Sequence, residues 1–340
     1  MRHVRAPRMK WTYVTRTLPR DTGTSVGEWR RPPRCGDLVV ARVIEIGAHA
    51  HAESRSGRRM RLHIGDLVVG ALGNRYATDF FEGYVLDQRG THLLTAGGLI
   101  GSVVSAHEIR ERPTQLEICG GLCDERGRPL STETFAAAIP ATPAATPPTV
   151  VVVGSGMNAG KTTAAAAIVL AFTRAGLRAG AGKVTGSGSG KDRWEYLDAG
   201  AVAVADFLDF GMSSTYGHPA ERLTTTMLAI RDQLAAAGCD VIVLEIADGL
   251  LMPETARLVE RLAGEVEAVV LATGDALSAH AGVEMLRRLD LPVRAVSGLV
   301  SRSPLATREA RDATGLPVLT VTELAAGSAL DLLPAGISSR

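Results

Sequence analysis

The chain has 340 residues, of which 46% are hydrophobic and 4% aromatic, and its formal net charge at pH 7 is +1. This length exceeds one typical hydrophobic core and suits two domains, while the nearly neutral charge disfavours a dedicated nucleic-acid binder. No run of about 18 uncharged apolar residues occurs that could span a membrane, and the four scattered cysteines are typical of reduced thiols in a cytoplasmic protein.

The first part of the chain predicts a basic arm followed by a β-rich domain. Residues 1–34 hold nine Lys or Arg against two acids, which indicates a loosely ordered arm or, as the alternative, a contact with RNA or an acidic partner. Residues 35–135 consist of short strand-like runs separated by glycine and polar turns, as in a small all-β, barrel-like domain. The sequence Gly-Asp-Leu-Val-Val occurs at 36–40 and again at 65–69, which predicts two equivalent strands entered by the same turn.

The second part of the chain predicts an α/β domain. Residues 136–148 are rich in Pro, Ala and Thr and form the expected linker. From 149 to 340, strands and helices alternate, which predicts a mostly parallel α/β sheet with helices on both faces. Expected strands lie near 150–154, 179–184, 240–245, 267–272, 294–300 and 317–321, and expected helices at 162–174, 221–237 and 254–262.

The most informative motif lies at 149–163 and reads Thr-Val-Val-Val-Val-Gly-Ser-Gly-Met-Asn-Ala-Gly-Lys-Thr-Thr. A β-branched strand here leads into a glycine-rich turn, whose backbone N–H groups can converge on a polyphosphate, and then into a helix whose N-terminus faces the anion. Lys161 can reach the β- and γ-phosphates and the Thr162 hydroxyl can bind Mg²⁺. A glycine turn that binds nothing is the alternative. The candidate nucleotide-binding residues of this motif are Gly154, Gly156, Asn158, Ala159, Gly160, Lys161, Thr162 and Thr163.

Further candidates follow the other strands, because ligands of such sheets bind at the carboxyl ends of the strands. Lys183 ends one strand and precedes a Gly-Ser tract that we expect to be a flexible lid rather than a second phosphate loop, since no apolar helix follows it. Glu245 ends another strand, in the usual position of a magnesium-directed carboxylate. Asp209 is a candidate second metal-directed carboxylate, or else a solvated acid. The roles of Asp206, Asp248 and His218 stay open.

Residues 149–325 resemble the dethiobiotin synthetase group of P-loop proteins, in the SIMIBI class, which includes the cobyrinic acid amide synthases. The group has its first glycine seven residues before the lysine, where Gly154 stands, a lysine on the second strand, and a Glu-Gly-Ala-Gly-Gly-x-x-x-Pro motif that residues 245–253 match in outline. The resemblance implies that Glu245 binds Mg²⁺ and that Lys183 contacts the substrate or the transferred phosphoryl group. Asp248 replaces a family glycine, and Arg302 replaces an asparagine that reads adenine.

The resemblance implies an enzyme, a Mg²⁺- and ATP-dependent ligase or kinase that phosphorylates a carboxylate or similar oxyanion of a small anionic substrate, with attack by an amine as an optional second step. Its catalytic residues would be Lys161, Lys183 and Glu245, GTP could replace ATP, and we expect a homodimer. The alternative is a nucleotide-gated binding or maturation protein with slow ATP or GTP hydrolysis, in which the β-domain docks a protein. A structural protein with an inactive phosphate loop is a third interpretation.

Overall fold

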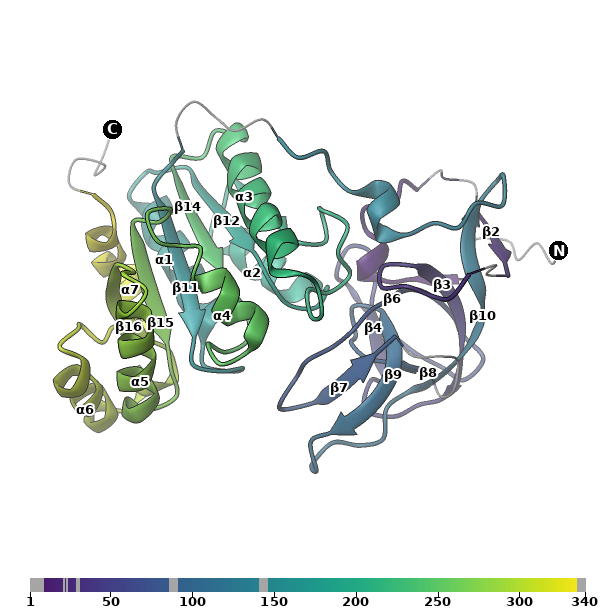
Figure 1. Cartoon of the computed structure of the whole chain (residues 1–340), viewed down its shortest axis with the longest axis horizontal. Helices are drawn as coiled ribbons and strands as arrows, with labels where there is room; N and C mark the ends of the chain where they lie inside the picture. Colours follow the sequence, from purple (N-terminus) through teal and green to yellow (C-terminus); the bar gives the residue numbers. More distant parts are fainter. Residues whose placement is uncertain are drawn as a thin grey trace. The chain divides into compact units, whose positions relative to one another are not determined.

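The computed structural model describes residues 9–20, 22, 24–28, 31–85, 91–140 and 146–334. The described residues form two compact units (Figure 1). The β-rich unit comprises the chain up to Ala138 together with two later segments, Ser187–Lys191 and Phe207–Gly217. The α/β unit comprises the rest. The division after Ala138 lies inside the linker that the sequence predicts at 136–148.

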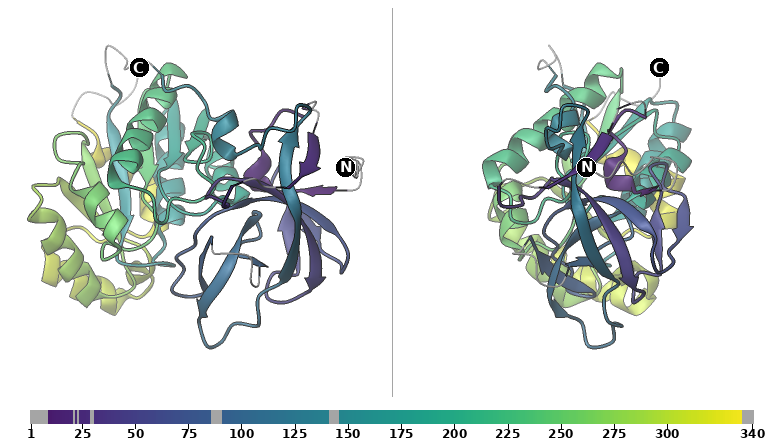
Figure 2. Two further views of the ribbon diagram at one scale, coloured as in Figure 1. Left: turned by 45° about the vertical axis from the view of Figure 1, so that its right-hand side comes forward. Right: turned by 90° about the vertical axis from the view of Figure 1, so that its right-hand side faces the viewer.

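Most strands of the β-rich unit curve into a barrel (Figure 2), while β4 and β5 pair only with each other in a separate two-stranded sheet. Strand β6 pairs with β3 and β9, and β10 pairs with β3 and β8, while β8 also pairs with β9, so these pairings close a ring. The strands are β1 (Met9–Trp11), β2 (Thr24–Gly27), β3 (Leu38–Glu45), β4 (His51–Glu53), β5 (Arg59–Arg61), β6 (Leu67–Leu72), β7 (Phe81–Tyr84), β8 (Thr91–Leu93), β9 (Leu99–Ala106) and β10 (Gln115–Asp124), with 3₁₀ turns η2 (Tyr13–Thr15) and η3 (Thr132–Phe135).

The repeated Gly-Asp-Leu-Val-Val sequence marks two equivalent strands, as predicted. It leads into β3 and β6, which pair antiparallel with each other. Gly36 and Gly65 both adopt φ 89°, a left-handed conformation that glycine reaches without a Cβ clash. Alternate residues of β3, Val39, Ala41 and Val43, then point into the barrel core.

Part of the predicted basic arm belongs to the barrel sheet. Strand β1 pairs in parallel with β6, and β2 pairs with β10. Between them Tyr13, Val14 and Leu18 are fully buried, so apolar burial outweighs the local excess of positive charge. The loosely ordered arm expected for 1–34 is therefore not found at these strands, and residues 1–8 lie outside the described residues.

The α/β unit is a parallel, 6-stranded sheet with the strand order β13-β12-β14-β11-β15-β16. Helices α1, α2 and α7 pack on one face, with Val150 and Val152 of β11, and α3, α4 and α5 on the other (Figure 1). The predicted α/β fold class is confirmed. The strands are β11 (Thr149–Gly154), β12 (Ala179–Lys183), β13 (Ala203–Asp206), β14 (Val241–Glu245), β15 (Ala268–Ala272) and β16 (Val293–Ser297). The helices are α1 (Lys161–Arg174), α2 (Gly190–Asp198), α3 (Ala220–Ala236), α4 (Pro253–Val259), α5 (Ala276–Arg287), α6 (Pro304–Thr314) and α7 (Val321–Ala326), with 3₁₀ turns η4 (Leu299–Arg302) and η5 (Ser328–Leu332).

Several elements of this unit differ from the sequence predictions. The strand expected at 317–321 is absent, because Val318 forms only an isolated bridge with Val296 and α7 begins at Val321. The short strand β13 was not predicted. Helix α2 follows the Gly-Ser tract, where no apolar helix was expected; this helix is mostly polar and buries Tyr196 as its one fully enclosed side chain. Throughout the described ranges, every helix is too short or too polar to cross a membrane.

Candidate nucleotide site

The predicted phosphate loop connects β11, an inner strand of the sheet, to helix α1. The Ser155 N–H donates to the Ala272 carbonyl at 3.0 Å, which fixes the start of the loop to β15. Asn158 and Gly160 adopt φ 60° and 99°, the left-handed region that glycine and asparagine tolerate best. The chain thus turns sharply into α1 at Lys161. All the predicted loop residues from Gly154 to Thr163 lie in this one turn and the first residues of α1.

Glycines of two neighbouring loops allow close packing against the phosphate loop. A Cβ on Gly249 would lie 2.7 Å from the Ser155 carbonyl oxygen, and one on Gly298 would lie 2.1 Å from the Ala159 oxygen. Backbone bonds reinforce these approaches, since Leu250 N–H donates to the Gly154 oxygen and Leu299 N–H to the Ala159 oxygen, both at 3.1 Å. Neither Gly249 nor Gly298 is among the site residues predicted from the sequence. The sequence feature that could have indicated Gly249 is its place four residues after Glu245.

Lys161 is buried beside the loop that it would serve. Its Nζ donates to the Gly156 carbonyl oxygen at 2.8 Å, and only 6% of the residue is exposed. Burial lowers the pKa of Lys161, and the charges of Glu245 and Asp248 partly oppose this effect. A phosphate group would supply the negative charge that this buried ammonium lacks.

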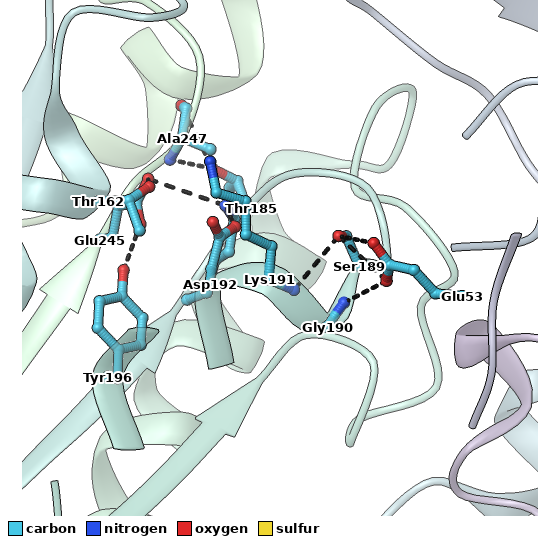
Figure 3. A network of polar contacts seen from close by, with 11 residues as sticks. Glu53, Thr162, Thr185, Ser189, Gly190, Lys191, Asp192, Tyr196, Glu245 and Ala247 are labelled. Carbon is cyan, nitrogen blue, oxygen red and sulfur yellow. Dashed lines mark hydrogen bonds and ion pairs between the residues drawn. The ribbon is translucent and has the colours of Figure 1, made fainter. Parts of the chain in front are cut away.

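Glu245 lies at the centre of a polar network at the end of β14 (Figure 3). Thr162 Oγ1 donates to Glu245 Oε1 at 3.1 Å, and the buried Tyr196 hydroxyl donates to Glu245 Oε2. Burial, followed by the charge of Glu245, raises the pKa of Tyr196 well above its usual value. Tyr196 was missed in the sequence because it lies on α2, which was itself not predicted.

The Thr162 hydroxyl and the Glu245 carboxylate fit a Mg²⁺ site. Mg²⁺ binds oxygen ligands and usually keeps several waters, so that one or two protein ligands suffice beside the phosphates of a nucleotide. Within the described ranges, no group of three or more His, Cys, Asp or Glu side chains is arranged to hold a metal.

Lys183 lies directly beside Glu245. The two residues are register partners on β12 and β14, and Lys183 Nζ lies 3.8 Å from Glu245 Oε1 while also bonding to Asp192 of α2. Burial alone would lower the pKa of Lys183, but the two carboxylates outweigh it and raise the pKa. The lysine is therefore charged and already has two anionic partners, and its role towards a substrate stays a prediction.

The remaining candidates occupy different places. Asp248 adopts φ 65° and is buried, and burial raises the pKa of its carboxyl to about 6 although Lys161 and Lys183 oppose the rise. Asp209 belongs to the β-rich unit, where Arg16 donates to its carboxylate at 2.6 Å. Arg302 is exposed at the end of η4. Asp206 is buried at the end of β13, and His218 precedes α3. The metal contact of Asp209 and the base contact of Arg302 stay predictions, and the roles of Asp206, Asp248 and His218 stay open.

The two segments that follow β12 and β13 are bonded within the β-rich unit. Glu53 of β4 accepts hydrogen bonds from Ser189 Oγ at 3.0 Å and from Gly190 N–H at 2.7 Å (Figure 3). In the second segment, the Ser213 hydroxyl donates to the Leu72 oxygen at 3.0 Å. Other bonds of this segment join Ser214 to Asn74, Thr132 to Gly211, and Tyr84 to Tyr216. The tract expected to be a flexible lid is thus fixed by a carboxylate of β4 in the β-rich unit.

No family model matches the sequence, and a search of curated proteins finds no match. Solved structures give partial likenesses. The 54 kDa protein of the signal recognition particle from Aeropyrum pernix K1, in complex with GDP, is 21% identical, with a TM-score of 0.37, over 56% of this chain and 49% of its own length. The receptor FtsY from Elizabethkingia anophelis is 17% identical, with a TM-score of 0.36, over 56% of this chain and 67% of its own. Chloroplast FtsY from Physcomitrella patens is 14% identical, with a TM-score of 0.38, over 58% and 69%.

This chain therefore spans about half the length of the first of these proteins. Likeness at this level does not identify a function. The resemblance to the dethiobiotin synthetase group stays an expectation based on the motifs, while the glycine-rich turn between β11 and α1 and the parallel sheet are observed in the structure itself.

Proposed function

We propose that this chain is a Mg²⁺-dependent P-loop nucleotide hydrolase whose bound nucleotide gates the β-rich unit for a protein partner. The observation that carries the proposal is the position of Ser187–Lys191 and Phe207–Gly217. Each segment begins where a strand of the nucleotide-binding sheet has ended, yet each belongs to the β-rich unit and bonds to residues of that unit. Since phosphates bind at the carboxyl ends of such strands, a change in the nucleotide is well placed to alter the barrel.

The proposed chemistry uses the loop and the end of β14. Lys161 and the backbone N–H groups of the loop would bind the phosphates, and Thr162 and Glu245 would hold Mg²⁺, which neutralises charge on the transferring phosphoryl group when it is bound. Tyr196 orients the Glu245 carboxylate by donating to Oε2. Because Lys183 is already neutralised by Asp192 and Glu245, its charge is less available to a small anionic substrate, and this favours gating over substrate phosphorylation.

One observation supports a second candidate function. A partly buried lysine beside the metal-directed carboxylate is also the arrangement expected of a ligase or kinase that phosphorylates a small carboxylate or similar oxyanion. In that case a substrate would displace Asp192 from Lys183, and ATP or GTP would serve as the phosphoryl donor.

The test compares nucleotide states by hydrogen exchange on the full chain. With Mg²⁺ and a non-hydrolysable ATP or GTP analogue, exchange should differ from the diphosphate state at 187–191, at 207–217 and at their partners near 53 and 72–74. The variant Lys161→Ala should abolish the difference. A difference confined to 154–163 and 245–250 would overturn gating. Phosphate release that depends on one small carboxylic acid would instead support the ligase or kinase candidate.

A further inference from the structure

Helix α2 is divided between the two units. Gly190 and Lys191 belong to the β-rich unit, whereas the helix from Asp192 onward belongs to the α/β unit. Its N-terminus is capped by Glu53, whose Oε2 accepts the Gly190 N–H at 2.7 Å and whose carboxylate also accepts the Ser189 hydroxyl at 3.0 Å and 3.3 Å (Figure 3). A carboxylate at this position satisfies an orphan N–H group and interacts favourably with the helix dipole. The cap comes from β4, more than a hundred residues earlier in the chain.

The same helix carries two side chains to the candidate nucleotide site. Asp192 bonds to Lys183, and Tyr196 donates to Glu245. Residues four apart lie on one face of a helix, so both contacts depend on the same rotation and the same axial position of α2. Tyr196 also packs in the hydrophobic core of the α/β unit. A shift of the helix start would therefore change the hydrogen bonding of Glu245 and the ion pairing of Lys183 together.

We infer that Glu53 is a positioning residue that acts on the nucleotide site through α2. By capping Gly190 it holds the helix so that Tyr196 orients the metal-directed carboxylate, and the state of the β-rich unit thereby sets the affinity for Mg²⁺ in the presence of nucleotide. The inference rests on the proposed function, and it names the element and the residue of the β-rich unit by which that site is regulated.

The test measures the Mg²⁺ concentration that gives half-maximal nucleotide binding by the full chain. Glu53→Ala should raise this concentration about fivefold, as expected for the loss of a helix cap, and should leave metal-free nucleotide affinity within about twofold. Tyr196→Phe keeps the packed ring but removes the hydroxyl, and should have a similar effect. Glu53→Gln, which retains an acceptor oxygen, should be intermediate.

The matched control is Asp66→Ala. Asp66 is another partly buried carboxylate of the β-rich unit that accepts a backbone N–H, that of His63 at 2.7 Å, and its loss should leave the Mg²⁺ dependence unchanged. Because Glu53 acts through Tyr196, the double variant should be no worse than either single variant, whereas independent effects would multiply. Ser189→Ala provides a milder perturbation of the same cap if Glu53→Ala does not fold, and should shift the Mg²⁺ dependence in the same direction.

Several results would overturn the inference. Unchanged Mg²⁺ dependence in folded Glu53→Ala would do so, and so would multiplying effects in the double variant or an equal loss of metal-free affinity. These outcomes are distinct from failure of the proposed function, which would appear as a wild-type chain that does not bind Mg²⁺ and nucleotide at all.

Discussion

Replacing Gly154 by alanine should displace Lys161 from the phosphate loop. The added Cβ would lie 2.7 Å from Cδ, 2.8 Å from Cγ and 3.1 Å from Nζ of Lys161, whereas non-bonded carbons favour separations of about 3.5–4.0 Å. The lysine must move by roughly 1 Å to restore such contacts. It would then lose the position from which Nζ donates to the Gly156 oxygen. The flexible side chain can yield, so the fold should survive while the site is altered.

The size of the effect follows from two contributions. An off-rotamer side chain costs about 0.5–1.5 kcal/mol, and a hydrogen bond to a charged group contributes about 1.5–3 kcal/mol. We expect a combined loss of about 2–4.5 kcal/mol in nucleotide binding, which corresponds to an affinity about 30- to 2,000-fold weaker. The assay is titration of a fluorescent nucleotide analogue with Mg²⁺, together with phosphate release and a thermal melt.

Gly274→Ala is the matched control for this prediction. Gly274 also follows a strand of the sheet, but a Cβ at that position meets no atom within 4 Å, so affinity should stay within about twofold of wild type. Equal affinities of Gly154→Ala and Gly274→Ala, with both proteins folded, would refute the reasoning about Lys161.

Three further predictions concern single side chains. Glu245→Gln should reduce the gain in nucleotide affinity that Mg²⁺ provides, while metal-free nucleotide affinity changes less, because the loop N–H groups still hold the phosphates. Mg²⁺ titrations of the variant and the wild type that superimpose would contradict this. Lys183→Ala should leave the basal hydrolysis rate within about threefold of wild type if the protein is a gated binder, and should lower turnover about a hundredfold if it is a ligase or kinase. Steady-state phosphate release distinguishes the two outcomes. Burial, assisted by the charge of Arg75, lowers the pKa of His49 from 6.5 to about 4. Since the unfolded chain binds more protons between these values, the unfolding free energy should fall by about 3 kcal/mol as the pH drops from 6.5 to 4. Urea unfolding should show this slope in wild type, and His49→Gln should flatten it; equal slopes would refute the assignment.

Local patterns were sufficient to predict the phosphate loop and its two flanking elements. The valines at 150–153 are β-branched and fully buried in β11, and the glycines after them leave room for a tight turn. The alternation of apolar strands with helices also predicted the parallel sheet. These features depend on neighbours in sequence, which is why pattern reasoning could find them.

The segments that matter most for the proposed gating could not be predicted in this way. Ser189 bonds to Glu53 across 136 residues, and Ser213 bonds to Leu72 across 141. Serine hydroxyls and backbone groups make these bonds, and such groups show no periodic pattern. Helix α2 could not be predicted for the same reason, because its position is set by one buried tyrosine and a cap from β4 rather than by an apolar stripe.

The charge balance around Glu245 gives a physical reason why a bound metal would change the contacts of α2. Two ammonium groups, the buried one of Lys161 and the partly buried one of Lys183, interact with the three carboxylates of Glu245, Asp192 and Asp248. When phosphates engage Lys161, Glu245 would be the carboxylate that holds Mg²⁺, and it would then be less available to Lys183 as an anionic partner. Lys183 then depends more on Asp192, because a buried ammonium needs an anionic partner. Nucleotide binding should therefore tighten the link between β12 and α2, the helix whose first residue is held by the β-rich unit through Glu53.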